Sequence, residues 1–239
     1  MRVDDTFVRR HTADVHLRDG TRVRLRPIVP DDKPALVSGF ARLSPESRYR
    51  RFMTAIDALT PQQLVYLTEI DYVDHFAWIA FAIDLPATPG LGVGRYVRIA
   101  DAPDAAEAAV AVVDEYHNHG LGTLLLEALA TAALENGITR FRFYVLENNR
   151  PMLEVLHRLE ARFTVDEPGV LCGELVIPPQ LERLKDTSLY RTLRAAARGE
   201  VPVASRVLRL DGEGPPTRRR AHRRRPRTAG GRGRRAREP

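Results

Sequence analysis

The residues most able to do chemistry are grouped in a short polar stretch, residues 114–119, and in the two glycines that follow it, Gly120 and Gly122. Residues 110–113 before this stretch are apolar and mostly β-branched, which predicts a buried strand. Residues 124–134 after it carry apolar side chains at helical spacing, which predicts an amphipathic helix. A glycine loop that leads into a helix brings backbone N–H groups and the positive end of the helix dipole close to a ligand. The pattern therefore predicts a phosphate-binding loop.

Two familiar phosphate motifs do not fit this loop. No Lys-Ser or Lys-Thr pair follows Gly122, which disfavours a P-loop for nucleotide triphosphates. The glycines are not spaced as G-x-G-x-x-G, which disfavours a dinucleotide-binding fold. The remaining candidate ligand is the pyrophosphate of coenzyme A.

The loop resembles the phosphate loop of the GCN5-related N-acetyltransferase (GNAT) superfamily, whose pattern is Gln/Arg-x-x-Gly-x-Gly/Ala. Here residues 117–122 read His-Asn-His-Gly-Leu-Gly, with His at the first position where Gln or Arg is usual. The resemblance implies an acyltransferase that uses acetyl-CoA as co-substrate. The cofactor-binding residues that it implies are Val112, Val113, His117, Asn118, His119, Gly120, Leu121, Gly122, Thr123, Asn149 and Met152.

The resemblance also assigns main-chain roles within this set. The N–H groups of Gly120, Gly122 and Thr123 are expected to face the pyrophosphate. The main chain of Val112 and Val113 is expected to pair with the pantetheine amides. One N–H there would point at the thioester oxygen and stabilise the oxyanion of the reaction.

Asn149 and Met152 belong to the start of a later predicted helix. In the family an Asn at this position lines the cofactor channel, and an N-cap role for Asn149 is compatible with that one. The family often has a Tyr four residues beyond Met152, as general acid for the departing thiolate, but Leu156 occupies that position here. Protonation of the thiolate is then left to another group, with Tyr144 one candidate, or to solvent.

A second, narrower resemblance covers residues 17–52. The string Leu-Ser-Pro-Glu-Ser-x-Tyr-x-Arg-Phe at residues 43–52 is similar to one in the acetyltransferase domain of bacterial protein-lysine acetyltransferases. The resemblance implies a protein lysine as acceptor, and the acceptor protein to expect from it is an acyl-CoA synthetase. The alternatives are a small-molecule amine acceptor and a catalytically weak CoA-binding regulatory module. That family often fuses the domain to a cyclic-nucleotide-binding or synthetase-like domain, and no such domain is expected here.

Glu107 is a single carboxylate in an otherwise apolar predicted strand, residues 106–113. Such a side chain is either exposed on an edge or directed into a cleft. In the lysine acetyltransferases that the chain resembles, the Glu of an Ala-Glu-x-Ala-Val segment acts as general base. Burial would raise its pKa toward the useful range. We therefore expect Glu107 to be catalytic.

His117 and His119 also have the chemistry of metal ligands. Two His without further ligands nearby in the sequence make a poor zinc site. We expect them to contact phosphate or solvent, and we expect no metal.

The elements that must position these residues follow in the order strand, helices, three strands, helix, strand, helix and two strands. A hairpin is predicted over residues 16–27, with its turn at Asp19 and Gly20. Residues 101–104 are predicted to be a turn. The later strands are predicted at residues 76–84, 92–99, 106–113, 139–146, 162–165 and 170–177. This order predicts an α/β fold with a mixed, mostly antiparallel central sheet and helices on both faces, as in the GNAT acyl-CoA N-acyltransferases.

The chain is expected to have four segments. They are a flexible N-terminal arm (1–15), the GNAT acetyltransferase domain (16–177), a C-terminal helix (178–199) and a disordered Arg-rich tail (200–239). The tail holds 13 Arg and 4 acidic residues, which leaves residues 1–199 with 24 Lys and Arg and 27 Asp and Glu. Because the tail has no aromatic residues, we expect at most weak, non-specific contact with nucleic acid there.

The cysteine content, the longest apolar run and the N-terminal sequence indicate the cellular location to expect. The single cysteine, Cys172, excludes an internal disulfide framework and a cysteine-based zinc site. The longest apolar run, residues 76–83, is too short to cross a bilayer. The N-terminus carries no apolar signal segment, so a cytoplasmic protein without a membrane partner is expected.

Overall fold

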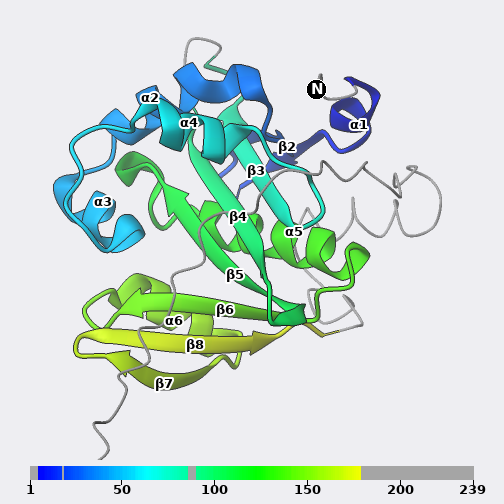
Figure 1. Ribbon diagram of the computed structural model, residues 1–239. Helices are drawn as coiled ribbons and strands as arrows, with labels where there is room; N and C mark the ends of the chain where they lie inside the picture. Colours follow the sequence, from blue (N-terminus) through cyan, green and yellow to red (C-terminus); the bar gives the residue numbers. More distant parts are fainter. Residues whose placement is uncertain (1–4, 18, 86–89, 179–239) are drawn as a thin grey trace, which may run out of the picture. The chain divides into compact units, whose positions relative to one another are not determined.

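A computed structural model describes residues 5–17, 19–85 and 90–178. Eight strands form one sheet in the order β1-β2-β3-β4-β5-β6-β8-β7 (Figure 1). β5 and β6 are parallel, and the other neighbouring pairs of described strands are antiparallel. The strands are β1 (Ala13–His16), β2 (Arg22–Pro27), β3 (His75–Ala82), β4 (Gly92–Ile99), β5 (Ala102–Val112), β6 (Arg140–Leu146), β7 (Arg162–Glu167) and β8 (Val170–Val176).

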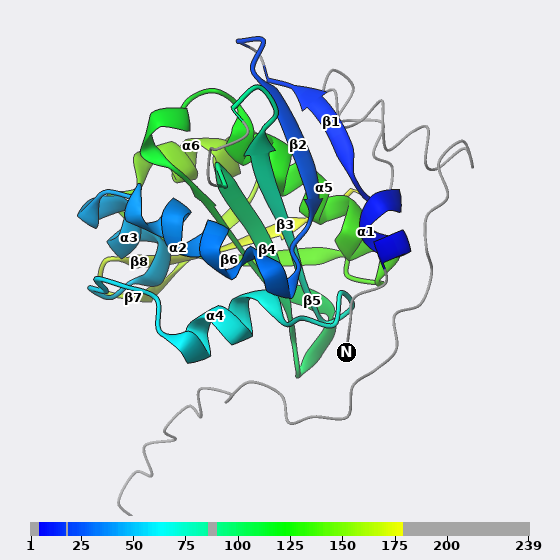
Figure 2. The ribbon, with the colours of Figure 1, turned by 90° about the horizontal axis from the view of Figure 1, so that it is seen from above.

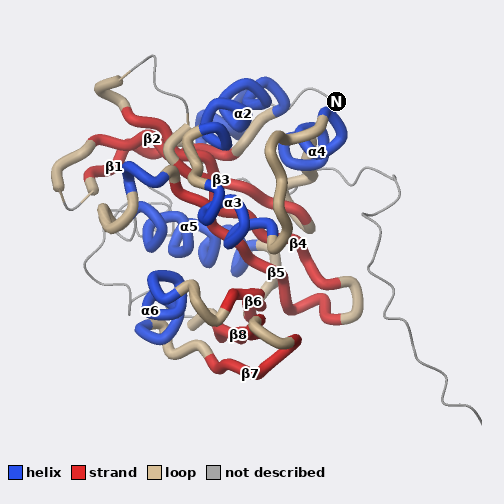
Figure 3. Tube along the Cα trace, turned by 90° about the vertical axis from the view of Figure 1, so that its left-hand side faces the viewer, coloured by secondary structure: helices blue, strands red, loops and turns tan. Residues whose placement is uncertain are grey.

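Helices lie on both faces of this sheet (Figures 2 and 3). Alternate residues of β3 show the two faces: Phe76 and Trp78 belong to the core under α5, whereas Ala77 and Ile79 pack against α2. The predicted fold class is therefore confirmed. The helices are α1 (Asp5–Arg10), α2 (Lys33–Ala41), α3 (Pro45–Phe52), α4 (Pro61–Thr68), α5 (Leu121–Glu135) and α6 (Arg150–Arg158), with short 3-10 turns η1 (Pro30–Asp32) and η2 (Asp114–Tyr116).

Helix α5 packs directly on the backbone of β4. A Cβ at Gly94 would lie 3.1 Å from Leu129 Cδ1 and 3.2 Å from Leu125 Cβ. Leu125 and Leu129 are fully buried. This close contact fixes the position of the helix whose first turn carries the predicted phosphate loop.

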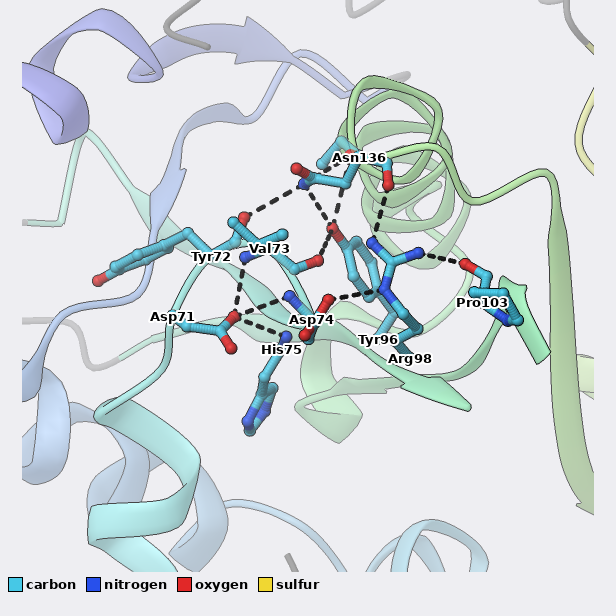
Figure 4. A network of polar contacts seen from close by, with 10 residues as sticks. Asp71, Tyr72, Val73, Asp74, His75, Tyr96, Arg98, Pro103 and Asn136 are labelled. Atoms are coloured by element: carbon cyan, nitrogen blue, oxygen red, sulfur yellow. Dashed lines mark hydrogen bonds and ion pairs between the residues drawn. The ribbon is translucent and has the colours of Figure 1, made fainter. Parts of the chain in front are cut away.

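A polar network holds the other end of α5 (Figure 4). Asn136, the C-cap residue, donates from Nδ2 to the Tyr96 hydroxyl (2.8 Å) and to Tyr72 O (3.2 Å). Arg98 donates to Asn136 O (2.8 Å) and to the carboxylate of Asp74 (2.7 Å). These contacts connect α5 to β4 and to the loop before β3, so both ends of the helix are anchored.

The N-terminal segment differs from the predicted loose arm. Residues 5–10 form α1, and β1 begins at Ala13 and pairs with β2, so the hairpin is longer than predicted. A tertiary contact holds this segment against the domain, because the ring centroids of Phe7 and the buried Tyr72 are 5.0 Å apart.

The predicted turn over residues 101–104 is wrong, because β5 already begins at Ala102. The register of β4 and β5 shifts between Arg98 and Ile99, and Asp104 then forms an ion pair with Arg140 of β6. This irregularity lies between the pairs Ile99–Ala102 and Arg98–Ala106, and β5 pairs with β6 from Ala105 while it remains paired with β4. The predicted C-terminal helix from residue 179 onward and the Arg-rich tail lie outside the described residues. No described helix is long and apolar enough to span a membrane.

Candidate active site

The strands β5 and β6 diverge after a short parallel contact. Their register covers three pairs, Ala105 with Arg140, Ala106 with Phe141 and Glu107 with Arg142. Beyond Glu107, β5 continues beside β4, and β6 continues beside β8 (Figure 1). The divergence opens a cleft of about 630 Å³ between residues 108–112 of β5 and residues 143–145 of β6.

Most of the predicted cofactor-binding residues line this cleft. They are Val112, His117, Asn118, Gly120, Gly122, Thr123, Asn149 and Met152. Val113, His119 and Leu121 do not belong to its lining. Segments far apart in the sequence, the loop before α5 and the start of α6, therefore meet at one cavity.

The backbone of β5 presents alternate residues to the cleft. The N–H of Val113 donates to Leu91 O (2.9 Å), on the β4 side of the strand. Hydrogen-bonding direction alternates along an antiparallel strand, so the main chains of Val112 and Val110 face the other way, toward the cleft. His117 Nε2 donates to Val112 O (2.9 Å) from that side. The N–H of Val113 is therefore bonded to the β4 side, whereas Val110, which was not predicted, lines the cleft together with Val112.

The loop before α5 has the geometry of an anion site. Gly120 is the N-cap with φ of 87°, a conformation that favours glycine, and α5 has no acidic residue in its first turn. The first N–H groups of a helix lack intrahelical partners. Nothing lies within 4 Å of a Cβ placed on Gly122, so that side of the first turn is open.

The two histidines of the loop have protein partners. His119 Nδ1 donates to the carboxylate of Asp19 (2.5 Å), in the turn between β1 and β2. Hydrogen bonds from Thr21, and after them the one from His119, lower the pKa of Asp19 to about 2. His119 thereby ties the loop to the β1–β2 hairpin. Among the described residues, no group of three or more His, Cys, Asp and Glu side chains has a metal-binding arrangement.

Helix α3 is connected by a hydrogen bond to the turn that directly follows β5. Ser44 caps α3 by accepting from Ser47 N (3.2 Å), and Ser44 N donates to the Asp114 carboxylate (3.3 Å). Burial alone would raise the pKa of Asp114, but hydrogen bonds from Ser44 and Ser47 bring it below its usual value. The string at residues 43–52 thus has a structural reason: it places Ser47, Arg50 and Arg51 on the rim of the cleft.

Glu107 lies at the apex where the two strands separate, on the face of β5 opposite to the buried Ala106 and Ala108. Its side chain is exposed, which is one of the two positions that the sequence left open for this carboxylate. Glu107 is not among the residues that line the cleft, whose lining on β5 begins at the next residue, Ala108.

The wall formed by β6 and α6 contains a phenol. Tyr144 lines the cleft, and burial raises the pKa of its hydroxyl. Leu156 of α6 is fully buried in the core and does not reach the cleft. The side chain of Asn149 caps α6 by accepting from Met152 N (3.4 Å), and Asn149 also lines the cleft. The N-cap position and the position in the cleft wall are therefore compatible in this residue.

Comparisons with known proteins agree with this architecture. Residues 22–162 match a family model described as an acetyltransferase (GNAT) domain. The chain is 33% identical over 191 residues to acetyltransferase Pat from Mycolicibacterium smegmatis, an alignment that covers 80% of this chain and 56% of Pat. The chain thus spans about half the length of that relative.

Two solved structures are also similar. The GNAT domain of S. lividans PAT matches with a TM-score of 0.65 and 33% identity, over 73% of this chain and 99% of that one. A cAMP-binding acyltransferase from Mycobacterium smegmatis matches with a TM-score of 0.55 and 30% identity, over 82% of this chain and 56% of that one.

Proposed function

The chain belongs to the GNAT acetyltransferase family, and from this premise we propose that it transfers an acetyl group from acetyl-CoA directly to the side-chain amine of a protein lysine. The observation that carries the proposal is the diverging strand pair β5 and β6 beside an open helix N-terminus. The cleft accepts an extended ligand along β5, and the first turn of α5 accepts its phosphates.

The residues of the cleft have distinct tasks in this reaction. Gly120, Gly122 and Thr123 of the loop hold the pyrophosphate with their backbone N–H groups. The main chains of Val112 and Val110 pair with the pantetheine arm, and an N–H of this edge donates to the thioester oxygen as negative charge develops there. No covalent enzyme intermediate is needed, because both substrates meet at the apex of the cleft.

Glu107 acts as the general base. It takes a proton from the acceptor ammonium, directly or through a water, which frees the nitrogen lone pair for attack on the carbonyl carbon. The carbon–sulfur bond then breaks, the nitrogen loses its second proton to solvent, and the departing thiolate takes up a proton. Tyr144 of β6 lines the cleft, and we assign to its hydroxyl the transfer of this proton, after which solvent reprotonates the phenolate.

The lysine acceptor rests on two similarities. The string at residues 43–52 resembles that of bacterial protein-lysine acetyltransferases, and the chain is similar to Pat and to the GNAT domain of S. lividans PAT. An acyl-CoA synthetase is the acceptor protein we would test first. A small-molecule amine acceptor and a weakly catalytic CoA-binding module remain the competing functions.

One screen separates these functions. Acetyl-CoA consumption is measured with an acyl-CoA synthetase, with polyamines, with aminoglycosides and with amino acids, and CoA binding is measured by calorimetry. The proposal expects consumption with the synthetase and an acetylated lysine in it. Consumption only with a small amine supports the first competitor, and CoA binding without turnover on any amine supports the second.

A further inference from the structure

Two arginine side chains lie on the face of the sheet that carries Glu107. Arg95 of β4 and Ala109 of β5 are Cα partners, and Ala109 lies two residues after Glu107, so these side chains share one face. Arg51 of α3 lines the cleft. Arg51 and Arg95 together line a smaller, mainly apolar pocket under α2, which borders the cleft at Ala111.

Arg95 is a buried cation, with 5% of its surface exposed. Its guanidinium donates to Leu67 O (2.8 Å) and to His75 Nε2 (2.5 Å). Burial lowers the pKa of His75 to about 3, so the imidazole is neutral and accepts this hydrogen bond. Both partners of Arg95 are therefore uncharged.

No carboxylate in the described ranges forms an ion pair with Arg51 or Arg95. Burial lowers the pKa of Arg51, and the charge of Glu107 opposes this effect from a distance. Tyr66 also lies near Arg95, Glu107 and Arg51, and burial raises the pKa of its hydroxyl, which keeps the phenol neutral. The cluster therefore carries two positive charges and one negative charge.

An uncompensated charge is costly to bury, and an anion that pairs with it removes part of that cost. A guanidinium group binds a carboxylate through two parallel hydrogen bonds. Arg51 is half-buried and lines the cleft. Arg95 lines only the smaller pocket, so it adds its positive charge to the site without reaching the cleft itself. The pair thus suits one carboxylate that enters from the cleft.

We propose that Arg51, supported by Arg95, forms a carboxylate-binding subsite beside Glu107 that takes a carboxylate of the reacting substrates. This inference rests on the proposed acetyltransferase function and adds a substrate preference to it. Two sources have this chemistry: an acidic side chain next to the acceptor lysine, and the far end of a dicarboxylic acyl group on CoA. Ala109, the partner of Arg95, lies about 7 Å along the strand from Glu107, which leaves room for an amine and a carboxylate side by side.

The test uses two matched substrate pairs with the full chain. The acceptor pair is a lysine peptide with a neighbouring Glu and the same peptide with Gln, assayed for kcat/KM with acetyl-CoA. The acyl pair is succinyl-CoA and butyryl-CoA, which differ by a carboxylate in place of a methyl group, and their Kd values are measured by calorimetry. A preference of about tenfold for the carboxylate member is expected in one pair, the size of one charged hydrogen bond. The pair that shows it identifies the source.

Arg51→Gln should bring that preference close to one, and Arg51→Lys should restore part of it. Arg48→Gln is the matched control, because Arg48 of the same helix does not line the cleft and donates instead to Leu43 O (3.0 Å), and this variant should keep the wild-type ratio. Thermal melting of each variant checks folding. Acetyl-CoA binding with no preference in either pair, or a preference that survives in Arg51→Gln, overturns the subsite. Failure to bind acetyl-CoA at all would instead overturn the proposed function.

Discussion

Gly122 offers a clean way to place a single negative charge in the proposed phosphate loop. Nothing lies within 4 Å of a Cβ at this position, and Gly122 does not have positive φ. Gly122→Ala therefore adds a methyl group without strain, and Gly122→Asp adds a carboxylate at the same point. Comparing the two variants separates the effect of charge from the effect of a side chain.

The size of the charge effect follows from Coulomb's law. A carboxylate at residue 122 would lie roughly 6 Å from the two charges of the CoA pyrophosphate, and each repulsion is worth about 1.4 kcal/mol at an effective dielectric constant of about 40. Two charges give about 3 kcal/mol, or about 100-fold weaker binding. The same carboxylate favours the helix itself by about 0.3–1 kcal/mol, because it lies in the first turn of α5.

Calorimetry with CoA and a thermal melt of each variant measure both effects. Gly122→Asp should bind CoA about 100-fold more weakly than wild type with an unchanged or higher Tm. Gly122→Ala should stay within about threefold of wild type, because it adds no charge. Equal CoA affinity in all three proteins would refute the assignment of the pyrophosphate to this loop.

Four further variants test the rest of the account. Glu107→Gln should lower kcat/KM about 100-fold near neutral pH with CoA affinity unchanged, and a wild-type pH profile would remove Glu107 as base. Tyr144→Phe should lower kcat about tenfold, and unchanged kcat would leave protonation of the thiolate to solvent. Gly94→Val should destabilise the fold by about 1–3 kcal/mol in urea titrations, because α5 packs 3.1 Å away, and full stability would contradict that contact. Because the pKa of His75 is about 3 in the fold against 6.5 when free, the unfolded chain binds the extra proton. Stability should fall by up to about 1.4 kcal/mol per pH unit below pH 6.5, and His75→Gln should flatten this slope in urea titrations; an unchanged slope would exclude His75 as its cause.

The fold and the glycine loop before α5 were predictable because their signals are local. The apolar run of residues 110–113, the two glycines and the helical spacing after them lie within one stretch of sequence. The order of such elements then limits the sheet to few topologies. α1 was missed because its order comes from a tertiary contact, that of Phe7 with Tyr72.

The details of the site depend on pairing that no local pattern contains. Whether Val112 or Val113 turns its N–H to the cleft depends on which of them bonds to β4. The exposure of Glu107 depends on where β5 and β6 separate. In the sequence, Arg95 is only one more polar residue of a predicted strand. Its register with Ala109 places it near Glu107, and the hydrogen bond that holds α3 to the end of β5 places Arg51 near both.

The central claim is that a ligand held along β5 gives up its acetyl group to an amine at the apex of the cleft. Mass spectrometry of a mixture of acyl-CoA synthetase and small amines, incubated with the protein and acetyl-CoA, measures this transfer directly. The account predicts an acetyl group on a synthetase lysine with wild type and a large loss of that product with Glu107→Gln. Acetyl-CoA that is bound while no amine, in protein or metabolite, becomes acetylated would contradict it.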